Sequence, residues 1–222
     1  MADLASFHRK YCTETRDLTI HGRHFNFVVP KEIDPFIDFE NIVCGFPLWA
    51  KIWEPSWLLA EHVAKTPPSR LNKILEIGSG IGVVGIVAAS FGHDVTITEY
   101  DENALQFAGA NAEINCCPEV KICRLDWHRP ELEDKFDCII GSEVTFHERD
   151  YNSLLNLFRI YLKPHGRVIL ASGVRQSVLN ILRRMHRYFD VQINKYSIRG
   201  EDSRIPAVLC HMSPKEAEVK IS

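Results

Sequence analysis

Apolar and polar residues alternate in two distinct rhythms from residue 71 onward. Short apolar runs predict strands at 73–77, 94–99, 120–125, 136–142 and 167–172. Amphipathic stretches between them predict helices at 81–91, 102–115, about 150–162 and about 175–188. Strands that alternate with helices over short connections are typical of a parallel sheet covered by helices on both faces.

Two more strands are predicted near 190–197 and 205–211, with no helix between them. Their connection, Arg199-Gly200-Glu201-Asp202, is typical of a hairpin turn, so we expect an antiparallel edge strand. The predicted fold class is therefore α/β. We expect a doubly wound, mostly parallel, seven-stranded Rossmann-like sheet with an antiparallel edge strand.

The residues before this repeating pattern have a different arrangement. Residues 17–30 hold two alternating runs around His21-Gly22-Arg23, which predicts a hairpin. Residues 31–47 are irregular, and a helix is predicted from Ser56 to Ala64, ended by Pro67-Pro68. We therefore expect an N-terminal extension of hairpin and helix at 1–65, packed on a core at 66–222 in a single globular unit.

Composition narrows the class of protein. The chain has 222 residues, of which 45% are hydrophobic, and a formal net charge of −3. This charge argues against a large basic face for nucleic acid, and no run reaches the roughly 18 apolar residues of a membrane span. The first residues lack the basic and apolar regions of a signal peptide. Seven cysteines without a C-x-x-C pair, and scattered histidines, predict reduced thiols, a cytoplasmic protein and no metal site.

The most informative stretch runs from Lys73 to Gly82, where an apolar strand enters a glycine turn. Glycine lets a backbone turn sharply and approach a ligand closely. A dinucleotide site requires G-x-G-x-x-G, but the third glycine would then fall at Val83. The chain instead has glycines at 78, 80 and 82, with Glu76 two residues before the first. The spacing therefore disfavours a dinucleotide as the ligand.

This E-x-G-x-G-x-G pattern resembles the first motif of class I S-adenosylmethionine-dependent methyltransferases, which implies S-adenosylmethionine as the cofactor. The segment from Trp53 to Ala60 and the pair Asp126-Trp127 resemble elements of the protein-lysine methyltransferase-like group, methyltransferase family 16. In that group the tryptophan element packs beside the cofactor, and an acidic-Trp pair ends the third strand of the core. The resemblance covers roughly residues 45–175 and implies a methyltransferase with a protein substrate.

Ligands of open parallel sheets lie beyond the carboxyl ends of the strands, so the candidate site residues cluster there. Glu99 ends the second core strand, 21 residues after Gly78, where a carboxylate can accept both ribose hydroxyls. Asp126 can accept from the adenine amino group, and Trp127 can cover the base. The predicted cofactor-binding set is Trp53, Glu76, Gly78, Ser79, Gly80, Gly82, Glu99, Tyr100, Asp126, Trp127 and Ser142.

The acceptor side departs from the family pattern. Active members carry D-x-x-Y after the fourth core strand, and this chain has Glu143-Val144-Thr145-Phe146. Glu143 takes the Asp position and Phe146 the Tyr position, so both are predicted catalytic residues, with Glu143 orienting the acceptor rather than acting as a base. Lysine is the favoured acceptor. Two alternatives stay open: a small-molecule N-methyltransferase, and a catalytically silent cofactor-binding module.

Overall fold

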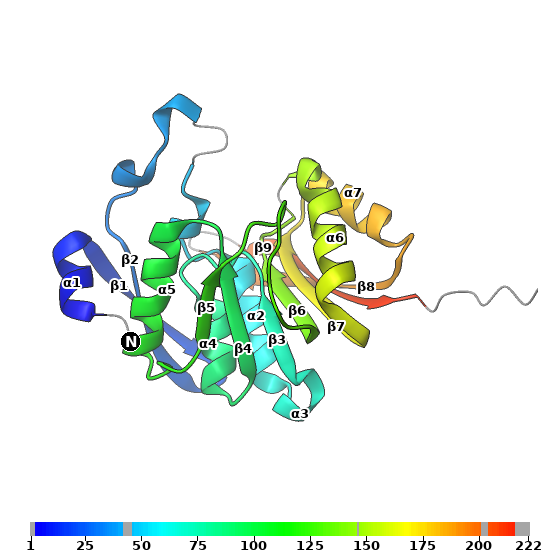
Figure 1. Ribbon diagram of the computed structural model, residues 1–222, viewed down its shortest axis with the longest axis horizontal. Helices are drawn as coiled ribbons and strands as arrows, with labels where there is room; N and C mark the ends of the chain where they lie inside the picture. Colours follow the sequence, from blue (N-terminus) through cyan, green and yellow to red (C-terminus); the bar gives the residue numbers. More distant parts are fainter. Residues whose placement is uncertain (1–2, 42–45, 146, 201–203, 216–222) are drawn as a thin grey trace, which may run out of the picture.

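The computed structural model describes residues 3–41, 46–145, 147–200 and 204–215. Its main feature is a seven-stranded sheet in the order β5-β4-β3-β6-β7-β9-β8 (Figure 1). The strands are β3 (Lys73–Glu76), β4 (Asp94–Glu99), β5 (Lys121–Arg124), β6 (Phe136–Ser142), β7 (Leu162–Gly173), β8 (Phe189–Arg199) and β9 (Arg204–Pro214). The predicted α/β class with a mostly parallel, doubly wound sheet is confirmed.

Strand direction changes only at the C-terminal end of the described chain. The first five strands pair in parallel, whereas β9 pairs antiparallel with both β7 and β8. The edge strand β8 therefore meets its neighbour in the antiparallel sense, as the predicted hairpin requires. The strand that runs against the others is β9, one position inside the edge. This inner position explains why β9 has a buried run from Ala207 to Cys210 while most of β8 is exposed.

Helices cover both faces of the sheet (Figure 1). They are α2 (Glu54–Lys65), the short α3 (Pro68–Leu71), α4 (Val83–Ser90), α5 (Glu102–Ile114), α6 (Tyr151–Tyr161) and α7 (Gln176–Met185). Successive residues of a strand enter different hydrophobic clusters, because their side chains point to opposite faces. In β3, Ile74 packs with side chains of α2, α4 and α5, and Leu75 packs with side chains of α6 and α7.

The N-terminal residues form a separate two-stranded sheet, as predicted. β1 (Thr13–Ile20) and β2 (Arg23–Pro30) pair antiparallel around the turn at His21 and Gly22. Before this hairpin lies α1 (Leu4–Lys10), and after it come three short 3-10 turns, Asp34–Phe36, Phe39–Asn41 and Leu48–Ala50. Buried residues of the hairpin join the same hydrophobic cluster as α2, α4 and α5. Among the residues that the structure describes, no helix is long and apolar enough to cross a membrane.

Candidate active site

The glycine turn follows β3 at the edge of the sheet where the parallel strands end. Gly78, Gly80 and Gly82 all adopt positive φ angles, of +57°, +55° and +88°. Residues with a side chain rarely adopt this conformation, so the turn depends on glycine. The backbone N–H of Ser79 donates to the carbonyl of Thr98 in β4 at 3.1 Å, and this hydrogen bond ties the turn to the neighbouring strand.

Glu99, the last residue of β4, holds this turn from the side. Its carboxylate accepts from the backbone N–H groups of Gly80 at 2.8 Å, Tyr100 at 2.6 Å and Asp101 at 3.3 Å. Burial raises the pKa of Glu99 above its ordinary value, although the three N–H donors oppose the rise. Each carboxylate oxygen has two lone pairs, so acceptor capacity remains for a ligand hydroxyl.

Glu76 lies deeper in the protein than its predicted role as a cofactor ligand suggests. Only 2% of the residue is exposed, and its carboxylate accepts from the Gly85 N–H at 2.9 Å. A Cβ atom at position 85 would collide with this carboxylate, so a glycine inside α4 makes room for it. Burial raises the pKa of Glu76 to about 8. The side chain thus fastens the start of α4 to the end of β3.

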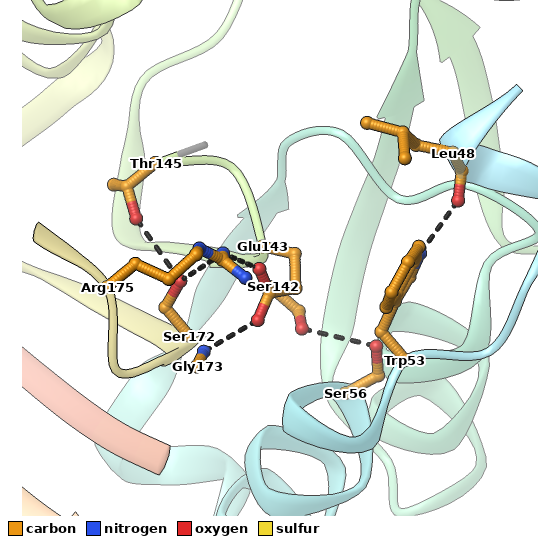
Figure 2. Close-up of polar contacts among 9 residues, drawn as sticks. All are labelled: Leu48, Trp53, Ser56, Ser142, Glu143, Thr145, Ser172, Gly173 and Arg175. Atoms are coloured by element: carbon orange, nitrogen blue, oxygen red, sulfur yellow. Dashed lines mark hydrogen bonds and ion pairs between the residues drawn. The ribbon is translucent and has the colours of Figure 1, made fainter. Parts of the chain in front are cut away.

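The segment before α2 covers the glycine turn. A Cβ atom on Gly80 would lie 3.2 Å from the carbonyl oxygen of Trp49. The indole N–H of Trp53 donates to the carbonyl of Leu48 at 2.7 Å, which closes the segment on itself (Figure 2). One turn into α2, the Ser56 hydroxyl lies 3.1 Å from that of Ser142 at the end of β6. We call residues 46–53 the cover segment.

Asp126 and Trp127 follow β5. One carboxylate oxygen of Asp126 accepts from the N–H of His128 at 2.8 Å, which shapes the loop. The Trp127 ring lies against the backbone of Gly78, where a Cβ atom would be 3.0 Å from the ring. The ring also packs on the buried cluster beneath α6 and α7. Trp127 therefore has a packing role in addition to the predicted contact with adenine.

Glu143 follows β6 in a left-handed conformation, with φ of +57°. One oxygen of its carboxylate accepts from the Gly173 N–H at 2.6 Å, and the other pairs with the Arg175 guanidinium (Figure 2). The predicted catalytic residue Phe146 lies outside the described residues. At this edge of the sheet, the acceptor-side carboxylate is thus held by the end of β7 and the residue before α7.

One cavity of about 530 Å³ connects these features. Its lining includes, of the predicted site residues, Trp53, Glu76, Gly78, Ser79, Gly80, Glu99, Tyr100, Asp126, Trp127, Ser142 and Glu143. Gly82 is not part of the described lining. A Cβ atom there would approach Ala108 of α5 at 3.2 Å, because Gly82 already caps α4 and faces the next helix. The third glycine thus serves helix packing, and its role at the ligand stays a prediction.

The structure adds lining residues that the motif did not indicate. They come from the cover segment and from the loops after β5 and β6: Phe46, Leu48, Trp49, Lys51, Ile52, His128, Arg149 and Asp150. From the sequence, Phe46 at the end of the irregular stretch 31–47 is a candidate for an aromatic wall around the acceptor amine, but the pattern did not indicate that Trp49 covers the glycine turn. The short distance between Trp49 and Gly80 shows that the cover segment lies over the glycine turn.

Residues 39–189 match the model of a protein family described as lysine methyltransferase. The chain belongs to this family. Its membership confirms the resemblance to the protein-lysine methyltransferase-like group that the motifs indicated.

Two relatives of this lysine methyltransferase family member come from mouse. EEF1A lysine methyltransferase 3 is 31% identical over 131 residues, which are 57% of this chain and 56% of that protein. Protein N-lysine methyltransferase METTL21A is 33% identical over 152 residues, which are 64% of this chain and 69% of that protein. The chain therefore spans little more than half the length of the first of these relatives.

Solved structures of other methyltransferases share the fold of this lysine methyltransferase family member. The glycopeptide N-methyltransferase MtfA, in complex with S-adenosyl-L-homocysteine, superimposes with a TM-score of 0.59 at 17% identity. The superposition covers 70% of this chain and 88% of MtfA. At this identity the likeness concerns the fold, and it agrees with the predicted Rossmann-like sheet.

Proposed function

We propose that this chain is an S-adenosylmethionine-dependent methyltransferase that transfers a methyl group to a lysine side chain of a protein. The observation that carries the proposal is the joining, in one cavity, of the glycine turn and Glu99 with Asp126, Trp127 and Glu143. The residues predicted for the cofactor and for the acceptor thus line one cavity. Family membership over residues 39–189 supports the same reaction class.

The residues of the cavity suit this cofactor. Its volume falls within the range of small-molecule sites, roughly 300–1,000 Å³. Glu99 offers a half-buried carboxylate for the ribose hydroxyls, and the glycine turn leaves its backbone open to the methionine part. Asp126 and Trp127 would hold the adenine. Trp53, at the start of α2, would cover the cofactor from the opposite side.

In methyl transfer the main task of the protein is to align the acceptor nitrogen with the methyl group. When bound, the cofactor supplies a methyl group on a positively charged sulfur, and a neutral thioether leaves. The acceptor amine must first lose a proton, which for free lysine costs roughly 4–5 kcal/mol at pH 7. Apolar surroundings lower the pKa of an amine, and Phe46 and Trp53 of the cover segment line the cavity for this purpose. The attacking lone pair must then lie in line with the methyl carbon.

Glu143 fits an orienting role better than that of a general base. Both of its oxygens already accept hydrogen bonds or an ion pair, from Gly173 and Arg175. A carboxylate beside the amine would also favour the charged form of the acceptor. We therefore assign Glu143 to holding the acceptor nitrogen, and Phe146 stays a predicted catalytic residue.

We further propose that the enzyme acts on a protein in the cytoplasm. The six cysteines that the structure describes are free thiols, which agrees with a reducing compartment. Burial raises the pKa of the Cys138 and Cys210 thiols to about 12, so these two side chains behave as inert core residues. The mouse relatives carry protein-lysine methyltransferase names, which supports a protein as the substrate.

Methylation of a cell lysate with methyl-labelled S-adenosylmethionine tests the proposal. We expect label on a protein band, stable to acid and base, with mass spectrometry locating it on lysine. The Glu99→Ala variant serves as the negative control, because it should lose most cofactor binding. Label in small solutes would instead favour the small-molecule N-methyltransferase. Tight binding of S-adenosylhomocysteine without any label transfer would favour the silent module that the E-x-x-F departure keeps open.

A further inference from the structure

The acceptor-side carboxylate is unusually well fixed for a residue that follows a strand. Glu143 is a non-glycine residue in the left-handed region, a conformation that costs free energy and persists only where surrounding contacts enforce it. Its N–H donates to the Ala171 carbonyl at 2.9 Å, and its carboxylate accepts from the Gly173 N–H at 2.6 Å. The end of β7 thus holds both the backbone and the side chain.

Arg175 holds the Glu143 carboxylate from outside the described lining of the cavity. Its guanidinium pairs with Glu143 and also donates to the Ser172 hydroxyl at 3.3 Å, and Ser172 in turn lies 3.3 Å from the Thr145 hydroxyl (Figure 2). Glu143 lines the cavity, whereas Arg175 does not belong to its described lining. Arg175 therefore acts on a substrate through Glu143 and not by touching it.

The charge of this pair matters because water screens it poorly. The side chain of Glu143 is only 12% exposed and that of Arg175 is 34% exposed. An unpaired carboxylate at this depth would attract cations strongly. The other charged or titratable side chains that line the cavity are Lys51, Glu76, Glu99, Tyr100, Asp126, His128, Arg149 and Asp150. Arg175 forms the ion pair with Glu143 and thereby balances the charge of its carboxylate.

We propose that Arg175 is a positioning residue that fixes the Glu143 carboxylate and cancels its charge, so that the acceptor amine binds as the neutral nucleophile. This inference rests on the proposed methyl transfer to an amine. With Arg175 present, Glu143 can accept one N–H from the amine without holding it as an ammonium ion. Without Arg175, the carboxylate would stabilise the ammonium form and raise the pKa of the bound amine, which leaves no lone pair for attack.

Binding of n-butylamine, a mimic of the lysine side chain, tests whether Arg175 cancels the charge of the Glu143 carboxylate. The measurement does not depend on turnover. The complex with S-adenosylhomocysteine is titrated at pH 7, where the amine is a cation, and line broadening of its NMR signals reports affinity. We expect Arg175→Gln to bind the cation at least about fivefold more tightly than the parent. Arg175→Lys, which keeps the charge, should behave like the parent. Glu143→Gln combined with Arg175→Gln should abolish the gain.

Turnover on the labelled protein band supplies the second readout. Arg175→Gln should lower kcat at pH 7.5 by at least about fivefold and recover activity at higher pH, where the bound amine loses its proton more readily. Arg175→Lys should restore most of kcat. Affinity for S-adenosylhomocysteine should stay within about twofold in each variant, which excludes general loss of structure. Arg183→Gln is the matched control, because Arg183 is an exposed arginine of α7, the helix that follows Arg175, and it should change neither readout.

Two results of the n-butylamine titration would overturn the inference. One is unchanged affinity for n-butylamine in Arg175→Gln, and the other is the same gain of affinity when Glu143 is already Gln. A loss of kcat that is equal at every pH and is not rescued by Arg175→Lys would reduce Arg175 to a structural role. If the parent labels no protein, the proposed function fails by itself, and the n-butylamine titration still decides whether Arg175 cancels the charge.

Discussion

Glu99 is the residue on which cofactor affinity should depend most directly. Glu99→Ala removes the proposed acceptor for the ribose hydroxyls and also releases the Gly80 N–H. We expect binding of S-adenosylhomocysteine to weaken by about 1–3 kcal/mol, measured by titration calorimetry. Glu102→Ala is the matched control, since Glu102 lies three residues away with a side chain that is 70% exposed. Equal affinity in the parent and Glu99→Ala would remove Glu99 from the site.

Gly80 tests the cover segment as well as the turn. A methyl group at Gly80 would meet the Trp49 carbonyl, so Gly80→Ala must shift the cover segment besides straining a left-handed residue. Gly22→Ala is a suitable control, because Gly22 also has positive φ and a Cβ there would meet nothing within 4 Å. Backbone strain of about 1–2 kcal/mol should appear in both variants by urea unfolding. Only Gly80→Ala should also lose affinity for S-adenosylhomocysteine.

At the scale of elements, two asparagines hold the N-terminal hairpin, Asn111 in α5 and Asn115 directly after it. Asn111 is fully buried; its side chain accepts from the Val28 N–H at 2.7 Å and donates to the carbonyls of Val28 and Ile81 at 3.1 Å. Asn111→Ala should lower the free energy of unfolding by about 2–3 kcal/mol, because buried backbone groups lose their partners.

Asn115 offers the matched control for this prediction. It makes the same pair of hydrogen bonds to the backbone of Asn26, at 3.0 and 2.8 Å, but at the surface. Water can replace the Asn115 side chain there, so Asn115→Ala should lower the free energy of unfolding by about 1 kcal/mol or less. Urea unfolding of the two variants, side by side, measures the difference. Equal costs would mean that burial does not strengthen the link between α5 and β2.

Most elements could be predicted from the sequence because their apolar periods are long and regular. The predicted helix at 102–115 corresponds to α5, and the predicted strand at 136–142 to β6. The sequence pattern did not reveal α1, whose seven residues have one buried side chain, Phe7. That helix depends on a distant contact, the packing of Phe7 on Phe107 with ring centroids 4.9 Å apart. Local periodicity carries no information on such a contact.

The candidate site also contains some features that local sequence predicted and others that depend on the folded chain. The glycine turn lies within one short motif, and Glu99 ends the next strand, 21 residues after Gly78, so local sequence was enough to predict both. The pairing of Glu143 with Arg175 joins residues 32 positions apart, and two strands must be aligned before it exists. At Gly82 the motif gave no sign that the same position also packs α4 against α5.

For the whole molecule, the buried carboxyl of Glu76 makes stability depend on pH. Burial raises its pKa from the ordinary 4.5 to about 8, so the folded state keeps a proton that the unfolded chain releases. This contribution is fully present below pH 4.5 and is lost as the pH rises toward 8. Glu76→Gln keeps an acceptor for the Gly85 N–H but cannot ionise. Its urea midpoint, relative to the parent, should therefore rise steadily between pH 5 and about 8.

The exposed Glu133 provides the control for this pH series, because Glu133→Gln removes a charge without touching the core. Its midpoint should follow the parent at every pH. Parallel curves for Glu76→Gln and the parent would mean that Glu76 ionises alike in the folded and unfolded chains.

Because the N-terminal hairpin packs on α5, it cannot complete its native contacts during synthesis on the ribosome until α5 has been made. Val28 finds its hydrogen-bond partner Asn111 only 83 residues later. At about 5–20 residues per second, the hairpin waits roughly 4–17 s for the helix that completes it. During that interval its apolar face, including Phe25 and Phe27, lacks the part of its native surface that α5 provides. The nascent chain should therefore be a client of ribosome-associated chaperones until α5 emerges.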